Sequence, residues 1–120
     1  MNYSILSKKI KIVIPARRGS KGLPFKNRKL IYSTLKTIPE ELIKNVIIST
    51  DDEEIKQRFS NFKIHHRTAK VSLDSSSTKE TLIETCLDFD PETLVICLYT
   101  TYPERKWTDV ESAVEFFLKK

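Results

Sequence analysis

Four short apolar runs separated by helix-like segments constrain the fold of this chain more than any other feature of its sequence. They lie at residues 10–14, 46–49, 62–66 and 94–99, and Pro15 closes the first. The first, second and fourth are nearly continuous β-branched or apolar stretches, which is typical of parallel strands covered on both faces. Because parallel strands need crossover connections, the alternation predicts a doubly wound, Rossmann-like α/β sheet.

The segments between the runs carry helix start signals. Capping boxes are predicted at residues 50–53, 77–80 and 108–111, and a shorter helix is expected around residues 30–38. After the second and third boxes, apolar residues recur at helical spacing, which predicts buried helix faces. These residues are Leu82, Ile83, Cys86 and Leu87, and then Val110, Ala113, Val114 and Phe117.

A sheet of about four strands leaves an apolar edge on the fourth run or its neighbour. Another chain, further sequence or a local device would have to cover it. The 120 residues are long enough for a core, and we expect residues 1–120 to form a single domain.

Composition narrows the class of protein. No apolar run approaches the ~18–20 residues of a membrane span, and the first nine residues lack the apolar core of a signal peptide. We therefore expect a cytoplasmic protein with no membrane partner.

Cys86 and Cys97 are predicted to be buried free thiols. The net charge of +5 fits an anionic partner without choosing among nucleotide, nucleic acid and acidic sugar.

The chain has only two glycines, Gly19 and Gly22, and both lie in one basic segment after the first predicted strand. Glycines let backbone N–H groups approach an anion, and Arg17, Ser20 and Lys21 supply charge and a hydroxyl group. In a doubly wound sheet the ligand binds at the carboxyl ends of the strands, where this segment falls. The pattern therefore predicts a phosphate-binding loop.

Two other interpretations of this loop stay open. It matches neither the Walker A motif nor the dinucleotide-binding motif, and a basic segment is often a solvated turn. A nucleic-acid patch is less expected, because Phe25 alone is interleaved with the basic residues to stack on bases.

Residues 16–27, A-R-R-G-S-K-G-L-P-F-K-N, resemble the opening motif of the acylneuraminate cytidylyltransferases, the CMP-sialic acid synthetases. Relatives that activate 3-deoxy-manno-octulosonate share a looser version. Residues 48–55, 66–77 and 98–105 resemble further family segments in the same order, and Tyr99 stands where the family has glutamine. The first and third of these four matches are the specific ones.

The resemblance implies a truncated three-layer, mostly parallel fold of the nucleotide-diphospho-sugar transferase type. It implies transfer of CMP from CTP to a 2-keto sugar acid, such as N-acetylneuraminate or 3-deoxy-manno-octulosonate, with release of pyrophosphate and assistance from Mg²⁺. This chain would hold the nucleotide half. The metal-binding aspartates, the sugar-acid pocket and the dimerisation segment would lie beyond Lys120.

The resemblance also assigns roles to residues of this chain. Lys21 and Arg17 would be catalytic. The implied CTP-binding residues are Arg17, Ser20, Lys21 and Lys26 at the phosphates, Asn27 at the ribose, Arg67, Ser75, Ser76 and Ser77 around the cytosine, and Tyr99 at the end of the fourth strand.

Two alternatives to a complete transferase remain. One is a non-catalytic nucleotide-binding module, or half-domain, that lacks the acceptor site. The other is a protein that binds nucleic acid, which predicts steep salt dependence and indifference to free CTP. The expected protein partner is either a second copy of this chain, in a homodimer, or a different chain that completes the site.

Several chemically capable residues are predicted to be structural. Asp51 and Asp52 are expected to cap a helix rather than bind metal. His65 and His66 point to opposite faces of a strand and have no metal-ligand spacing. Glu84, like Glu80 one turn before it, is expected to be solvated.

Three residues near the fourth strand have two interpretations each. Trp107 and Tyr102 would either stack on a ligand or anchor a helix. Arg105 would either reach an acidic group in the cleft or face water.

Overall fold

The computed structural model describes residues 10–16, 26–66, 78–87, 89–100 and 106–118, with the backbone alone at 26–29, 78–81 and 118. The described strands are β1 (Ile10–Pro15), β2 (Val46–Thr50), β3 (Lys63–His66) and β4 (Leu94–Cys97). The described helices are α2 (Lys26–Lys36), α3 (Glu40–Ile43), α4 (Glu53–Arg58), α6 (Thr78–Thr85) and α7 (Trp107–Leu118).

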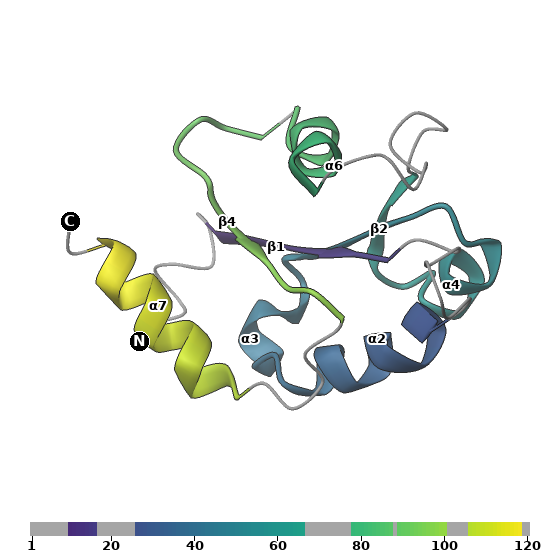
Figure 1. The fold of residues 1–120 in the computed structure, drawn as a ribbon, viewed down its shortest axis with the longest axis horizontal. Coiled ribbons are helices and arrows are strands. Elements are labelled where there is room, and N and C mark those ends of the chain that lie inside the picture. Colours follow the sequence, from purple (N-terminus) through teal and green to yellow (C-terminus); the bar gives the residue numbers. More distant parts are fainter. Residues whose placement is uncertain (1–9, 17–25, 67–77, 88, 101–105, 119–120) are drawn as a thin grey trace.

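The strands form one sheet in the order β3-β2-β1-β4, and every pairing is parallel. Ile14 is in register with Ile48, and Ile48 with Ile64. Helix α6 lies on one face of the sheet, while α2 and α3 lie on the other (Figure 1). The predicted three-layer α/β fold with a parallel sheet is therefore confirmed.

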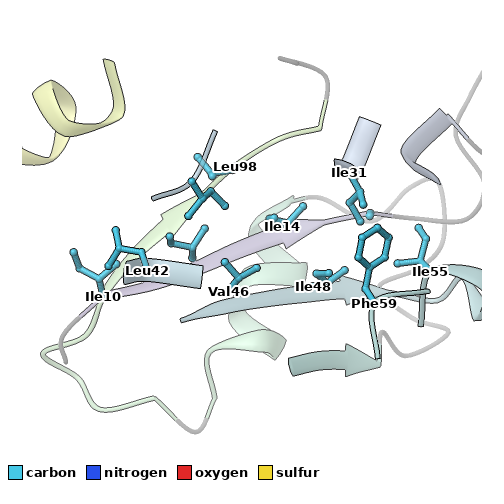
Figure 2. Packing of buried hydrophobic residues seen from close by; sticks show 12 residues of the cluster. Ile10, Ile14, Ile31, Leu42, Val46, Ile48, Ile55, Phe59 and Leu98 are labelled. Atoms are coloured by element: carbon cyan, nitrogen blue, oxygen red, sulfur yellow. The ribbon is translucent and has the colours of Figure 1, made fainter. Parts of the chain in front are cut away.

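The principal core lies between the sheet and the helices α2, α3 and α4. Successive side chains of a strand point to opposite faces, so alternate residues of β1 and β2 share this core. Figure 2 shows these strand residues packed against Ile31 of α2, Leu42 of α3 and Ile55 of α4. Val13 and Ile47 are buried on the opposite face, so β1 and β2 are covered on both faces, as their apolar runs predict.

Strand β4 differs from this expectation. It ends at Cys97 rather than Tyr99, and all four of its residues are partly exposed. It is an edge strand of the described sheet, which confirms the predicted apolar edge and explains why a run as apolar as β1 is not buried like β1.

Two predicted helix starts are wrong by one or two residues. Asp52, not Thr50, is the N-cap of α4, and α7 begins at Trp107, before Thr108. Helix α6 begins at Thr78, as the box at residues 77–80 predicts. The short helix α3 was not predicted from the sequence.

The predicted apolar faces of α6 and α7 are only partly buried. Ile83 and Leu87 are 55% and 73% exposed, and Phe117 of α7 is 61% exposed. Val114 is buried, whereas Ala113 is exposed. Helical spacing identifies an apolar stripe, but burial also needs an element packed against its whole width.

Neither cysteine forms a disulfide in the described structure, and both thiols are partly rather than fully buried. Desolvation by the surrounding protein raises the pKa of the Cys86 thiol. No helix in the described ranges has the length and apolar character needed to cross a bilayer.

Candidate functional site

The carboxyl ends of the four strands lie at one edge of the sheet, because every strand runs in the same direction. At this edge Pro15 of β1 is in register with Ser49 of β2, and Thr50 of β2 with His66 of β3. The segments that the sequence assigns to phosphate and cytosine, 17–25 and 67–77, follow β1 and β3 directly along the chain. Parallel topology therefore starts both segments from the same edge.

A buried corner fixes the point where the chain leaves β1. The Ala16 backbone N–H donates to the Ser49 carbonyl at 2.8 Å, and the Thr50 hydroxyl donates to the Ala16 carbonyl at 2.5 Å. The same hydroxyl oxygen accepts from the Asp52 N–H at 3.0 Å. Ala16 and Thr50 are fully buried, so this corner is shielded from water at the position immediately before Arg17.

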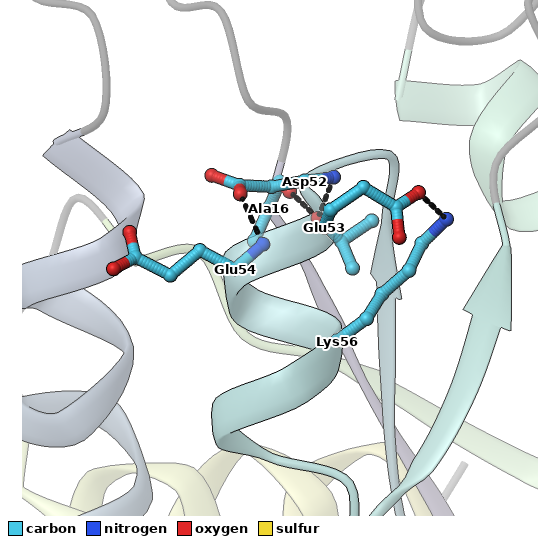
Figure 3. A network of polar contacts seen from close by, with 6 residues as sticks. Ala16, Asp52, Glu53, Glu54 and Lys56 are labelled. Atoms are coloured by element: carbon cyan, nitrogen blue, oxygen red, sulfur yellow. Dashed lines mark hydrogen bonds and ion pairs between the residues drawn. The ribbon is translucent and has the colours of Figure 1, made fainter.

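Asp52 begins helix α4 at this corner. Its Oδ1 accepts from the Glu54 backbone N–H at 2.9 Å (Figure 3). Its carbonyl accepts from the Lys56 N–H at 3.1 Å. A carboxylate at this position satisfies an otherwise unpaired N–H and complements the helix dipole. The predicted capping role of Asp52 is confirmed.

A second polar cluster joins β2, β3 and α6. His65 Nδ1 lies 2.8 Å from the Ser49 hydroxyl oxygen and 3.1 Å from that of Thr85, while its Nε2 lies 3.2 Å from Glu84 Oε1. Ser49 is fully buried, and the Glu84 side chain is 21% exposed. The prediction that Glu84 is solvated is wrong, because α6 lies on the sheet with Glu84 Oε1 beside the His65 ring of β3.

These contacts do not make a nucleophilic triad. A nucleophile has to reach the substrate, whereas Ser49 Oγ is fully buried and also accepts from the Thr85 hydroxyl at 3.4 Å. The cluster links elements beneath the site edge. Sequence analysis missed it because the pairing of Glu84 with His65 depends on where α6 lands.

At the end of β4 the chain exposes one predicted site residue. Tyr99 is 43% exposed, between the buried residues Leu98 and Thr100. The Leu98 N–H donates to the Val13 carbonyl at 3.0 Å, which extends the β1–β4 pairing beyond Cys97. Tyr99 is therefore accessible at the edge, and its contact with nucleotide stays a prediction.

The remaining predicted site residues are described in backbone only or not at all. Lys26 and Asn27 are the first two residues of α2, which places their backbone at the start of the helix that follows the glycine segment. The predicted residues outside the described ranges are Arg17, Ser20, Lys21, Arg67, Ser75, Ser76 and Ser77, together with Tyr102 and Arg105. Trp107 packs against the core cluster, which supports its role as a helix anchor.

Metal-ligating side chains do not gather in a cluster within the described residues. No group of three or more His, Cys, Asp or Glu side chains among them comes together as a candidate metal site. One oxygen of Asp52 is already engaged as a helix cap. A role for Mg²⁺ stays an expectation from the resemblance.

Comparison with known proteins gives consistent matches over nearly the whole chain. Residues 11–120 match the family model described as cytidylyltransferase. N-acylneuraminate cytidylyltransferase B of Danio rerio is 40% identical over 93 residues, covering 71% of this chain and 22% of the relative. N-acylneuraminate cytidylyltransferase A of the same organism is 30% identical over 123 residues, covering 95% of this chain and 29% of the relative.

A solved structure agrees at the level of the fold. CMP:2-keto-3-deoxy-manno-octonic acid synthetase complexed with CTP superposes with a TM-score of 0.70 at 24% identity. The match covers 93% of this chain and 48% of that one. The chain thus spans less than a third of the two curated relatives and about half of the solved structure.

Proposed function

Because this chain belongs to the cytidylyltransferase family, we propose that it binds CTP and forms the nucleotide half of an enzyme that transfers CMP to a sialic-acid-type 2-keto sugar acid. The observation that carries the proposal is the family match over residues 11–120, on a sheet whose topology starts the two predicted nucleotide segments from one edge. The names of the relatives support the sugar-acid class.

In the proposed reaction an anomeric hydroxyl oxygen of the sugar acid attacks the α-phosphorus of CTP in line. The new bond joins sugar oxygen to phosphorus, the bond from phosphorus to the bridging oxygen breaks, and pyrophosphate leaves with that electron pair. The proton of the attacking hydroxyl group is released to solvent. Such a reaction depends on positioning and on neutralisation of phosphate charge. Arg17, Ser20, Lys21 and Lys26 are proposed for the phosphates.

The fold explains how these side chains would be presented. The Thr50–Ala16 bond and the Ala16–Ser49 bond hold the backbone at the exit from β1, and α2 begins again at Lys26. Both anchors of the glycine segment are thus attached to the buried core through β1 and Ile31. A preorganised start and finish reduce the entropy lost when an anion is bound.

Calorimetric titration with CTP and ATP, each with and without Mg²⁺, tests nucleotide binding directly. We expect micromolar affinity for CTP, about −8 kcal/mol, and weaker binding of ATP. Lys21→Ala is expected to abolish CTP binding. Lys36→Ala is the matched control, because Lys36 is an exposed lysine in the last turn of α2. Equal affinity for both nucleotides, or no binding of either, would overturn the proposed CTP site.

A second assay separates a transferase from a non-catalytic module. Pyrophosphate release is measured with CTP and N-acetylneuraminate or 3-deoxy-manno-octulosonate, in the presence and absence of a chain containing the rest of a family member. Release of pyrophosphate supports the proposed transfer of CMP to the sugar acid. CTP binding without release in every combination would favour the module that lacks an acceptor site.

The cytoplasmic location also stays a prediction.

A further inference from the structure

We propose that Ser49, His65, Glu84 and Thr85 form a positioning cluster that holds α6 on the sheet and thereby sets how the segment 67–77 recognises the base of the nucleotide. The segment joins β3 to α6, and it carries Arg67 and Ser75–Ser77. This inference rests on the proposed function, because those residues are assigned to cytosine only by the family resemblance.

Both ring nitrogens of His65 have partners in the cluster. A carboxylate only accepts, so His65 Nε2–H donates to Glu84 Oε1 at 3.2 Å. In the neutral imidazole Nδ1 is then an acceptor, and it faces the hydroxyl groups of Ser49 at 2.8 Å and Thr85 at 3.1 Å. The Thr85 hydroxyl also lies within donating distance of Ser49 Oγ, at 3.4 Å. His65 is thus joined to α6 through both ring nitrogens and to β2 through Nδ1.

The polar contacts add a directional attachment to the apolar packing of α6. Ile83 is 55% exposed and Leu87, just beyond the helix, is 73% exposed, whereas Leu82 and Cys86 are half-buried and Thr85 is buried. Apolar contact is non-directional, but hydrogen bonds in a sheltered site specify one arrangement of their partners. The cluster is therefore well suited to fix both the position and the rotation of α6.

The cluster lies close in sequence to both ends of the cytosine segment. His65 is two positions before Arg67, and α6 begins at Thr78, directly after Ser77. The His65–Glu84 contact therefore fixes the two elements between which the segment has to pass. By contrast, the glycine segment is anchored by the separate corner at Ala16 and Thr50. Base recognition and phosphate binding are consequently expected to respond to different substitutions.

The test compares CTP with inorganic tripolyphosphate, which carries the phosphates without the base. We expect His65→Ala to weaken CTP binding about tenfold, the equivalent of ~1.4 kcal/mol, and to leave tripolyphosphate binding unchanged. Lys21→Ala is expected to weaken both. Lys63→Ala, which removes an exposed side chain from the start of the same strand, is the control and is expected to change neither.

Two conservative variants separate the two arms of the cluster, by which we mean the contact of His65 Nδ1 with Ser49 and the contact of His65 Nε2 with Glu84. The amide of His65→Asn falls near the Nδ1 position and that of His65→Gln near the Nε2 position, so the first retains the Ser49 arm and the second the Glu84 arm. If both arms hold α6, each variant gives a CTP affinity between those of the wild type and His65→Ala. Full restoration by one variant would assign the positioning to that arm alone.

Amide hydrogen exchange gives a readout that does not depend on nucleotide. His65→Ala is expected to accelerate exchange in α6 (Thr78–Thr85) and not in α4 (Glu53–Arg58). Unchanged exchange in α6 overturns the proposal whatever the binding data show. Faster exchange in α6, with an unchanged preference for CTP over tripolyphosphate, overturns the link to base recognition. If the wild-type chain binds neither ligand, the proposed function fails, and exchange alone decides whether the cluster positions α6.

Discussion

The central strands β1 and β2 and the edge strand β4 use similar apolar residues but bury them to different extents. Around the central strands, the core contains Ile14, Ile48 and Ile55, all with fully buried side chains. Strand β4 is partly exposed throughout, and Leu87 and Phe117, which precede and follow it in the chain, are largely exposed. The residue types do not explain this difference. A central strand has neighbours on both sides and helices on both faces, and an edge strand does not.

The comparison separates what stabilises the fold from what remains available at its surface. The region around β1 and β2 contains the core and the buried corner that precedes the glycine segment. The region around β4 contributes less buried apolar area, and the free energy of unfolding should therefore be less sensitive to substitutions there.

The largest effect on the free energy of unfolding is expected from truncation of a buried side chain in the central strands. Ile48→Ala removes a fully buried side chain of β2 and is expected to lower the free energy of unfolding by about 2–5 kcal/mol. Ile96→Ala, at the partly exposed strand β4, is the matched substitution and should cost clearly less. Urea denaturation measures both. An equal loss in the free energy of unfolding for both variants would contradict the difference between the central strands and β4.

The buried corner should give the next largest effect. Thr50→Val keeps the shape of the side chain but removes the hydroxyl that bonds both Ala16 and Asp52. Because the buried Ala16 carbonyl loses this donor, we expect a loss of about 1–3 kcal/mol in the free energy of unfolding. Thr108→Val, at an exposed position of α7, is the control. A loss no greater than that of the control would show that the corner does not stabilise the fold.

The helix cap should give a smaller effect. Asp52→Ala removes the oxygen that accepts from the Glu54 N–H and is expected to cost about 0.5–2 kcal/mol. Asp52→Ser retains a capping oxygen and should recover most of the loss. If thermal unfolding shows Asp52→Ser to be as unstable as Asp52→Ala, the role of Asp52 is not capping.

Substitution of the exposed apolar residues should barely change stability. Leu87→Ser combined with Phe117→Ser is expected to alter the free energy of unfolding by no more than ~0.5 kcal/mol, because both side chains are already largely in water. The measurement is urea denaturation at low protein concentration. A loss above about 1 kcal/mol would mean that these side chains are covered in solution.

The smallest effect concerns Cys86, at the end of α6. Its thiol pKa is raised by desolvation, so less thiolate is present in the folded than in the unfolded chain at the same pH. Alkylation of Cys86, followed by mass spectrometry of its peptide, should be slower in the folded chain. The associated stability is present below the ordinary thiol pKa and is lost as the pH rises through the raised value. Equal alkylation rates would contradict this burial effect.

Part of the site region was predictable because its signals are local. The strand that Pro15 closes, the helix start at Thr78 and the capping role of Asp52 follow from residues adjacent in the sequence. The assignment of α4 to a Thr50 cap failed for a tertiary reason. The Thr50 hydroxyl donates to the carbonyl of Ala16, which follows β1 and is far away in the chain, and Asp52 caps the helix two residues later.

The alternation of strands and helices, the parallel sheet and the family could all be predicted from the sequence, because apolar periodicity and short motifs depend on neighbouring residues. Which apolar runs are buried and which polar residues meet became clear only from the folded structure. The apolar run of β4 lies at an edge, and Glu84 contacts His65 although the two are separated by the whole segment 67–77. The physical reason is that burial and hydrogen bonding depend on what packs against a residue, and a crossover connection brings together residues that no local pattern relates.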